Sequence, residues 1–186
     1  MNYYFLLASL PAFLAGELAP VSMEEFLARC DRELSPADRR ELDAVLLADE
    51  DVAASCFARE WFRHERHIRN AIVHVRATRH GVDPGPWLRP VQGIDGFLAK
   101  AVGEAMARPN PLERELALDK VRWQALDDLA IGHDFDLAAV LIYALRLQLA
   151  LRLRGLTVED GHKAMKAFVV RSGSKAGFSE FRTQRT

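Results

Sequence analysis

One stretch of the chain carries most of the side chains that could bind a metal ion. Glu60, His64, His67 and His74 follow one another at steps of four, three and seven residues, so they share one face of a helix. Imidazole and carboxylate groups on one face can ligate a divalent transition metal. Arginines stand between them and would repel a dication, so a solvated charged face is the plainer interpretation and a metal site the alternative.

The same stretch is strongly basic. Residues 59–80 carry six arginines and four histidines against two glutamates. The spacing places a stripe of arginines along one helix, a pattern found in nucleic-acid-binding modules. The whole chain has a net charge of −1, however, and the same helix has an apolar face. We therefore expect no nucleic-acid partner and take the candidates for a protein interface to be Arg63, Arg66, Arg69, Asn70, Arg76 and Arg79.

Other local arrangements are weaker candidates for chemistry. His133 precedes Asp134 and Asp136 and could belong to acid–base machinery, but both aspartates are better explained as turn and helix-cap residues. A single Glu-x-x-His sequence, Glu159 to His162, is half of what a carboxylate-bridged di-metal bundle requires. The chain has no dinucleotide fingerprint, phosphate-binding loop, nucleophile elbow or zinc-protease motif. We expect no catalytic residues and no cofactor.

Helix start and stop signals organise the whole chain. Serine, aspartate or asparagine residues, two of them followed by proline, stand where helices should begin, and glycines stand where several should end. These signals predict helices over residues 23–29, 36–47, 51–80, 95–107, 111–132 and 137–154, with a last helix capped by Thr157. Phe135 is expected to pack beside the helix that Asp136 caps.

The pattern of apolar residues predicts the fold class. No segment alternates in the way of a half-buried strand, although Tyr3 to Leu7 could form one short N-terminal strand. Residues 137–154 are apolar nearly all round, so this helix should lie centrally. Its neighbour should bury Leu112, Leu116, Trp123, Leu126 and Ala130. We expect an all-α bundle of about seven helices in a single domain, residues 1–170, with a possible hinge at 82–92 and a flexible basic tail at 171–186.

Composition bears on the compartment. The two cysteines, Cys30 and Cys56, form no disulfide framework and suit a reducing cytoplasm. The apolar N-terminus lacks the basic start of a signal peptide, because no Lys or Arg precedes Arg29. The apolar segment from 137 to 153 contains Arg146 and Arg152, which a membrane span would exclude. A soluble cytoplasmic protein without a membrane span is expected.

Three segments together resemble a known family. They are the N-terminal Tyr3 to Pro11; Arg69-Asn70-Ala71-Ile72 with Arg76-Ala77 and Gly81; and a third set from Asn110-Pro111 through Arg122-Trp123 and Phe135-Asp136 to Gln148. In this order they are similar to a bacterial family of unknown function encoded beside the genes of V/A-type ATPases. That family is itself similar to the C subunit of the V-type ATP synthase, which corresponds to the d subunit of the eukaryotic enzyme. The resemblance covers most of residues 1–168. It depends on the three segments occurring together in this order, and no single motif is specific.

The resemblance implies a role without catalysis. The C subunit couples the rotor stalk to the membrane ring, so the protein would be a non-catalytic subunit or assembly component, peripheral to the inner membrane, with other ATPase subunits as partners. The C subunit has three helical repeats and about twice this length, whereas no repeat is found here. The alternatives stay a metal-binding bundle that uses the Glu60 face, or a nucleic-acid-binding helical module.

Overall fold

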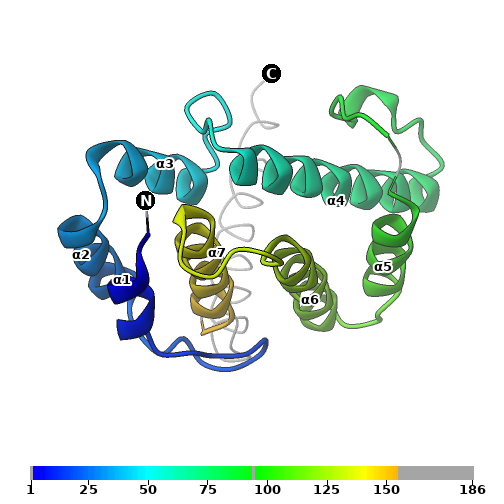
Figure 1. Ribbon diagram of the computed structural model, residues 1–186. Helices are drawn as coiled ribbons and strands as arrows, with labels where there is room; N and C mark the ends of the chain where they lie inside the picture. Colours follow the sequence, from blue (N-terminus) through cyan, green and yellow to red (C-terminus); the bar gives the residue numbers. More distant parts are fainter. Residues whose placement is uncertain (1, 94, 155–186) are drawn as a thin grey trace, which may run out of the picture.

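The described part of the protein, residues 2–93 and 95–154 of a computed structural model, is built from seven α-helices and one 3₁₀ turn (Figure 1). The predicted fold class, an all-α bundle in a single domain, is confirmed. The helices are α1 (Tyr4–Ser9), α2 (Met23–Glu33), α3 (Pro36–Leu47), α4 (Cys56–His80), α5 (Gly96–Met106), α6 (Pro111–Leu129) and α7 (Leu137–Arg154), with the 3₁₀ turn η1 at Gly85–Trp87. The helix capped by Thr157, the Glu159–His162 motif and the tail at 171–186 lie outside the described residues.

Serine side chains cap three helix starts, two at the predicted positions Ser22 and Ser35 and one at Ser55, which was not predicted. The hydroxyl oxygens of Ser22, Ser35 and Ser55 each accept the backbone N–H of the residue three positions on, which satisfies one of the free donors at a helix start. Gly81 ends α4 with φ 64°, the left-handed conformation that glycine adopts without steric cost. Local chemistry therefore fixes the ends of most helices.

The N-terminal segment Tyr4–Ser9 forms the helix α1, so the expectation of a short N-terminal strand was wrong. Tyr3, Leu6 and Leu10 are all buried, and their steps of three and four residues match a helix and not a strand. The Tyr3 hydroxyl donates to the carboxylate of Asp38, and the Tyr3 N–H donates to the Phe135 carbonyl. The segment is thus helical because one of its faces packs on the bundle.

The long helix α4 begins at Cys56, five residues later than predicted. The Asp49 carboxylate accepts the N–H groups of Asp51 and Val52, which holds this stretch as a turn. The Glu41 carboxylate accepts the N–H groups of Ala54 and Ser55. A side chain from α3, invisible to a local cap rule, therefore delays the helix start.

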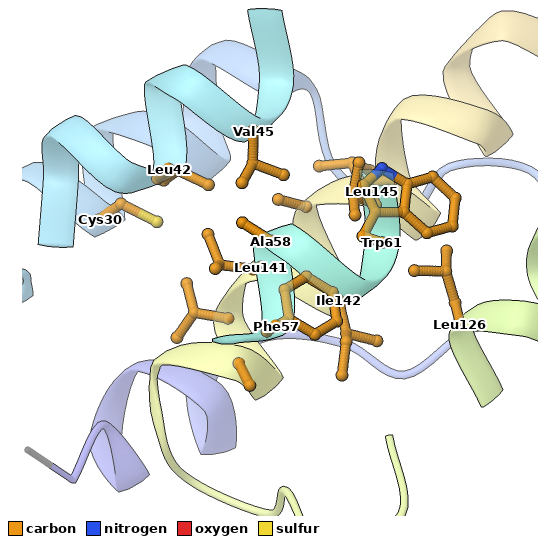
Figure 2. Packing of buried hydrophobic residues seen from close by; sticks show 14 of the residues in the cluster. Cys30, Leu42, Val45, Phe57, Ala58, Trp61, Leu126, Leu141, Ile142 and Leu145 are labelled. Atoms are coloured by element: carbon orange, nitrogen blue, oxygen red, sulfur yellow. The ribbon is translucent and has the colours of Figure 1, made fainter. Parts of the chain in front are cut away.

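Helix α7 lies between the N-terminal helices on one side and α6 on the other, while α4 starts near α7 and runs over α6 toward α5 (Figure 1). Its burial on nearly every side confirms the predicted central position. Figure 2 shows Leu141, Ile142 and Leu145 of α7 packed among side chains of α3, α4 and α6. On α6, Trp123 and Leu126 are buried as expected, but Leu116 is exposed and Leu118 and Ala125 take the buried positions.

The buried apolar residues form two clusters. The larger one surrounds α7 and includes Phe57 and Trp61 from the first half of α4. The smaller one joins α5 to the second half of α4 and the first half of α6, through Ile68, Val102 and Leu118. Because α4 and α6 take part in both clusters, they connect the two ends of the molecule. The hinge at 82–92 stays a prediction. No described helix is long and apolar enough to cross a membrane.

Candidate functional site

The four proposed metal ligands on α4 do not assemble. Glu60 forms an ion pair with Arg63, with an Oε2–Nη2 distance of 2.6 Å. His64 is half-buried, and its pKa is lowered by burial and by the nearby Arg63 charge. His74 is exposed. Over the described residues, no group of three or more His, Cys, Asp or Glu side chains is placed to hold a metal ion.

Most of the α4 residues that were proposed for a protein interface bind other residues of the same chain. Arg66 pairs with Glu50 at 3.3 Å, and Arg69 lies 3.8 Å from Glu65. Arg79 donates to the carbonyl oxygen of Met106, at the end of α5. Arg76 alone of the six proposed residues is exposed without a hydrogen bond or ion pair to any described residue. These contacts reduce the charge that the arginine stripe presents to solvent.

Asn70 has a clear structural role. Its Nδ2 donates to the Arg89 carbonyl at 2.8 Å, and its Oδ1 accepts the Arg89 N–H at 2.9 Å. The amide thereby satisfies both backbone groups of one residue in the segment that follows η1. Arg66 adds a bond to the carbonyl of the next residue, Pro90. The two side chains fasten the 82–92 segment along α4.

A chain of ion pairs joins α4, α6 and α7. Arg122 Nε lies 2.8 Å from Glu65 of α4, and Arg122 Nη1 lies 3.2 Å from Asp119 of α6. Arg152 of α7 approaches Asp119 at 3.6 Å and also pairs with Glu115. Asp119 is buried, and burial raises the pKa of its carboxyl against the opposing effect of Arg152 and Arg122. Its Oδ2 has no hydrogen-bond partner among the described residues.

This ion-pair network borders a cavity of about 350 Å³ between α3, α4, α6 and α7. Arg69, Arg122 and Arg152 face it together with Glu50 and Glu65, over apolar walls from the larger cluster. Each arginine already has a carboxylate partner. The charged groups at the cavity therefore bind one another or neighbouring carboxylates.

His133 and Asp136 form a local pair. The His133 Nδ1 lies 2.6 Å from Asp136 Oδ2, while Asp136 Oδ1 accepts the N–H of Ala139 and caps α7. Burial acts to raise the pKa of Asp136, but the hydrogen bonds from His133 and Ala139 outweigh it and lower the pKa. Phe135 contacts Tyr4, with ring centroids 4.9 Å apart, and this contact ties α1 to the start of α7. The geometry supports the cap interpretation of this motif.

Two surface features were not predicted from the sequence. Phe97, at the start of α5, is 92% exposed and stands between two cavities lined by residues of α4, α5 and α6. Tyr4, Phe5 and Phe135 bring three aromatic rings together at the surface, and we call them the aromatic patch. No motif announces either feature, because each depends on side chains from elements that only the tertiary fold brings together.

Comparisons with known family models, with curated proteins and with solved structures found no match to the chain. The family resemblance therefore stays a prediction and supplies no residue roles of its own. The geometry itself describes a helical bundle in which several arginines of α4 and α6 pair with carboxylates of the same chain.

Proposed function

We propose that the protein is a non-catalytic component of a bacterial V/A-type rotary ATPase, similar to the C subunit, that helps couple the stalk to the membrane ring. A coupling component needs a stiff body and contact surfaces, and it needs no reactive groups of its own. Support comes from the ordered resemblance together with the roles that its residues have in this fold.

Several of the residues that carry the resemblance hold the bundle together. From the first segment, Tyr3, Leu6 and Leu10 are buried. From the second, Asn70 fastens the 82–92 segment, and from the third, Arg122 bridges α4 and α6. A pattern made of core and bridging positions specifies a shape, and a defined shape is what a mechanical component requires. This is the observation that carries the proposal.

The first segment also has members that the fold does not bury. Phe5 is 80% exposed and touches Tyr4, whose ring contacts Phe135. Contiguous exposed rings are unusual on a monomer and are typical of contact surfaces. Asp134 and Asp136 flank Phe135 in the chain, and Asp38 lies against Tyr3. We therefore propose that the aromatic patch docks on a stalk subunit through an apolar surface bordered by basic residues.

Co-expression with the stalk and ring subunits of the same organism, followed by affinity purification of this chain, tests the proposal. We expect stalk subunits to co-purify with the wild-type protein and to be lost with Phe5→Asp. Leu47→Asp is the matched control, because Leu47 is equally exposed but lies at the end of α3, outside the patch. Absence of stalk and ring subunits from the wild-type preparation would refute the role.

The two alternatives stay open as predictions. A metal-binding bundle requires stoichiometric metal in the purified protein, which elemental analysis measures. A nucleic-acid-binding module requires binding that weakens steeply with salt and is lost when Arg66, Arg69 and Arg76 are changed to Glu. The intramolecular partners of Arg66 and Arg69 favour neither use of these side chains.

A further inference from the structure

Phe97 occupies an unusual position for a large apolar side chain. It belongs to the first turn of α5 and is 92% exposed, so the bundle does not use it for packing. Two cavities share Phe97 and Asp95 in their lining, one toward α4 and one toward α6. The side chain therefore stands on the border between two adjoining hollows.

The hollow on the α4 side has basic side chains in its lining. It has a volume of about 540 Å³ and is lined by Arg63, His67 and Lys100, among others. Neither Lys100 nor His67 has a hydrogen bond or ion pair with another described residue, so both are free to bind an anion. The Asp95 carboxylate instead accepts the Leu98 N–H at 2.9 Å, and Arg63 remains paired with Glu60. Lys100 and His67 are thus the groups to which an anionic ligand would bind.

The hollow on the α6 side is mainly apolar. Its volume is about 320 Å³, and Leu98, Ala101 and Val121 contribute to its walls. Lys120 and Asp128 stand at its polar edge together with Gln124, whose amide donates to Asp128. His64 also lines it, and the Nδ1 of this imidazole is buried without a hydrogen-bond partner among the described residues. A buried polar atom without a partner costs free energy.

We propose that these adjoining hollows form a binding site for a nucleoside phosphate. The phosphate groups lie against Lys100 and His67, and the base stacks on Phe97 with its edge toward the apolar hollow and His64. The ligand class follows from the combination of an unpaired lysine beside an imidazole, an exposed aromatic ring and an apolar recess, since a free phosphate would use only the first and a neutral aromatic compound only the others. The volumes fall within the roughly 300–1,000 Å³ of small-molecule sites. The proposal does not rest on the rotary-ATPase role.

Calorimetric titration of the full-length protein with ADP, adenosine and inorganic pyrophosphate tests the site. We expect ADP to bind more tightly than either of its parts. Phe97→Ala and Lys100→Ala should each weaken ADP binding by about tenfold, the loss of one stacking or charge-assisted contact. Phe97→Tyr should retain binding because it keeps a ring at the position.

Two matched variants serve as controls. Phe5→Ala removes an exposed ring in α1, and Arg76→Ala removes an unpaired cation from α4, and neither residue lines the two hollows. Both should bind ADP like the wild type. In an NMR titration, ADP should shift the backbone amides of residues 96–101. The proposal is overturned if ADP does not bind at millimolar concentration, if it binds no better than pyrophosphate or adenosine, or if its binding survives both Phe97→Ala and Lys100→Ala.

Discussion

The charged side chains of α4 use much of their hydrogen-bonding capacity inside the molecule. Arg66 and Arg69 reach carboxylates, Arg79 reaches a helix carbonyl, and Asn70 satisfies both backbone groups of Arg89. A residue type that is common in ligand-binding sites can equally stabilise the fold. An arginine or an amide has several hydrogen-bond donors, and a hydrogen bond to a nearby acceptor of the same chain is energetically favourable. At this scale, Phe97 and Lys100 are distinctive because the bundle makes little use of them.

Trp123 provides the strongest test of the core. It is 9% exposed, its ring meets Phe13 edge-to-face at 5.6 Å, and the Arg146 guanidinium lies 5.5 Å from the ring centroid. We predict that Trp123→Ala lowers the free energy of unfolding by about 3–5 kcal/mol, the usual cost of emptying a large aromatic core site. Denaturant unfolding followed by circular dichroism measures this loss.

Trp87→Ala is the control for that measurement. Trp87 lies in the 3₁₀ turn and is 59% exposed, so its removal should change stability by less than about 0.5 kcal/mol. Equal effects of the two substitutions would show that the environment of Trp123 is not the packed core described above.

Helix ends in this protein are set partly by neighbours. Ser22 and Ser35 cap α2 and α3 with their own hydroxyls, as local sequence predicts. The start of α4 depends in addition on Glu41 of α3, whose carboxylate accepts two N–H groups just before the Ser55 cap. A cap rule finds the first kind of boundary and misses the second, because the second needs a partner at a long separation along the chain.

Asp136 permits a pH test at the scale of one element. Asp136→Ala should destabilise the protein by about 1 kcal/mol at neutral pH, because it removes the α7 cap and the partner of His133. The folded protein lowers the pKa of Asp136 from its ordinary 3.8. The carboxylate's contribution is therefore fully present above about pH 3.8 and is lost as the pH falls through the lowered pKa.

The quantity to measure is the stability difference between wild type and Asp136→Ala as a function of pH. It should shrink on acidification. Asp134→Ala is the neighbouring control, since Asp134 is exposed and has no hydrogen bond or ion pair with a described residue. A difference that stays constant down to strongly acidic pH would contradict a role for the ionised cap.

On the scale of the whole molecule, two apolar clusters meet across a polar layer. Glu65 lies between the parts of α4 that belong to each cluster, and Asp119 and Arg122 lie between the corresponding parts of α6. The ion pairs thus stand where the two long helices pass from one cluster to the other. Arg122 has only 14% of its side chain exposed and contacts both carboxylates.

Removing Arg122 should therefore be costly. We predict that Arg122→Met destabilises the protein by roughly 3–5 kcal/mol, since it leaves Glu65 and Asp119 partly buried with fewer partners. Arg63→Met is the control: its pair with Glu60 is exposed and should contribute at most about 1 kcal/mol. Thermal unfolding of both variants measures the contrast, and similar small losses would mean that the clusters do not depend on the bridge.

Local sequence determined the fold class, most helix ends and the central helix. Serine caps, glycine stops and a helix that is apolar nearly all round act over a few residues, so their signal is legible along the chain. Only the tertiary structure decided that Tyr4 to Ser9 is helical, that α4 starts at Cys56 and that Leu116 is exposed while Leu118 is buried. These outcomes depend on which surface each element meets.

The same division holds for function. The sequence placed histidines and arginines on one helix, but it could not show that Glu50 would pair with Arg66 or that the Arg89 backbone would bind Asn70. Nor could it place Phe97 between a hollow lined by basic side chains of α4 and α5 and an apolar hollow toward α6. Side-chain chemistry is encoded locally, whereas the pairing or freedom of each group is decided by residues far away in the chain, because contact energies act through space and not along the sequence.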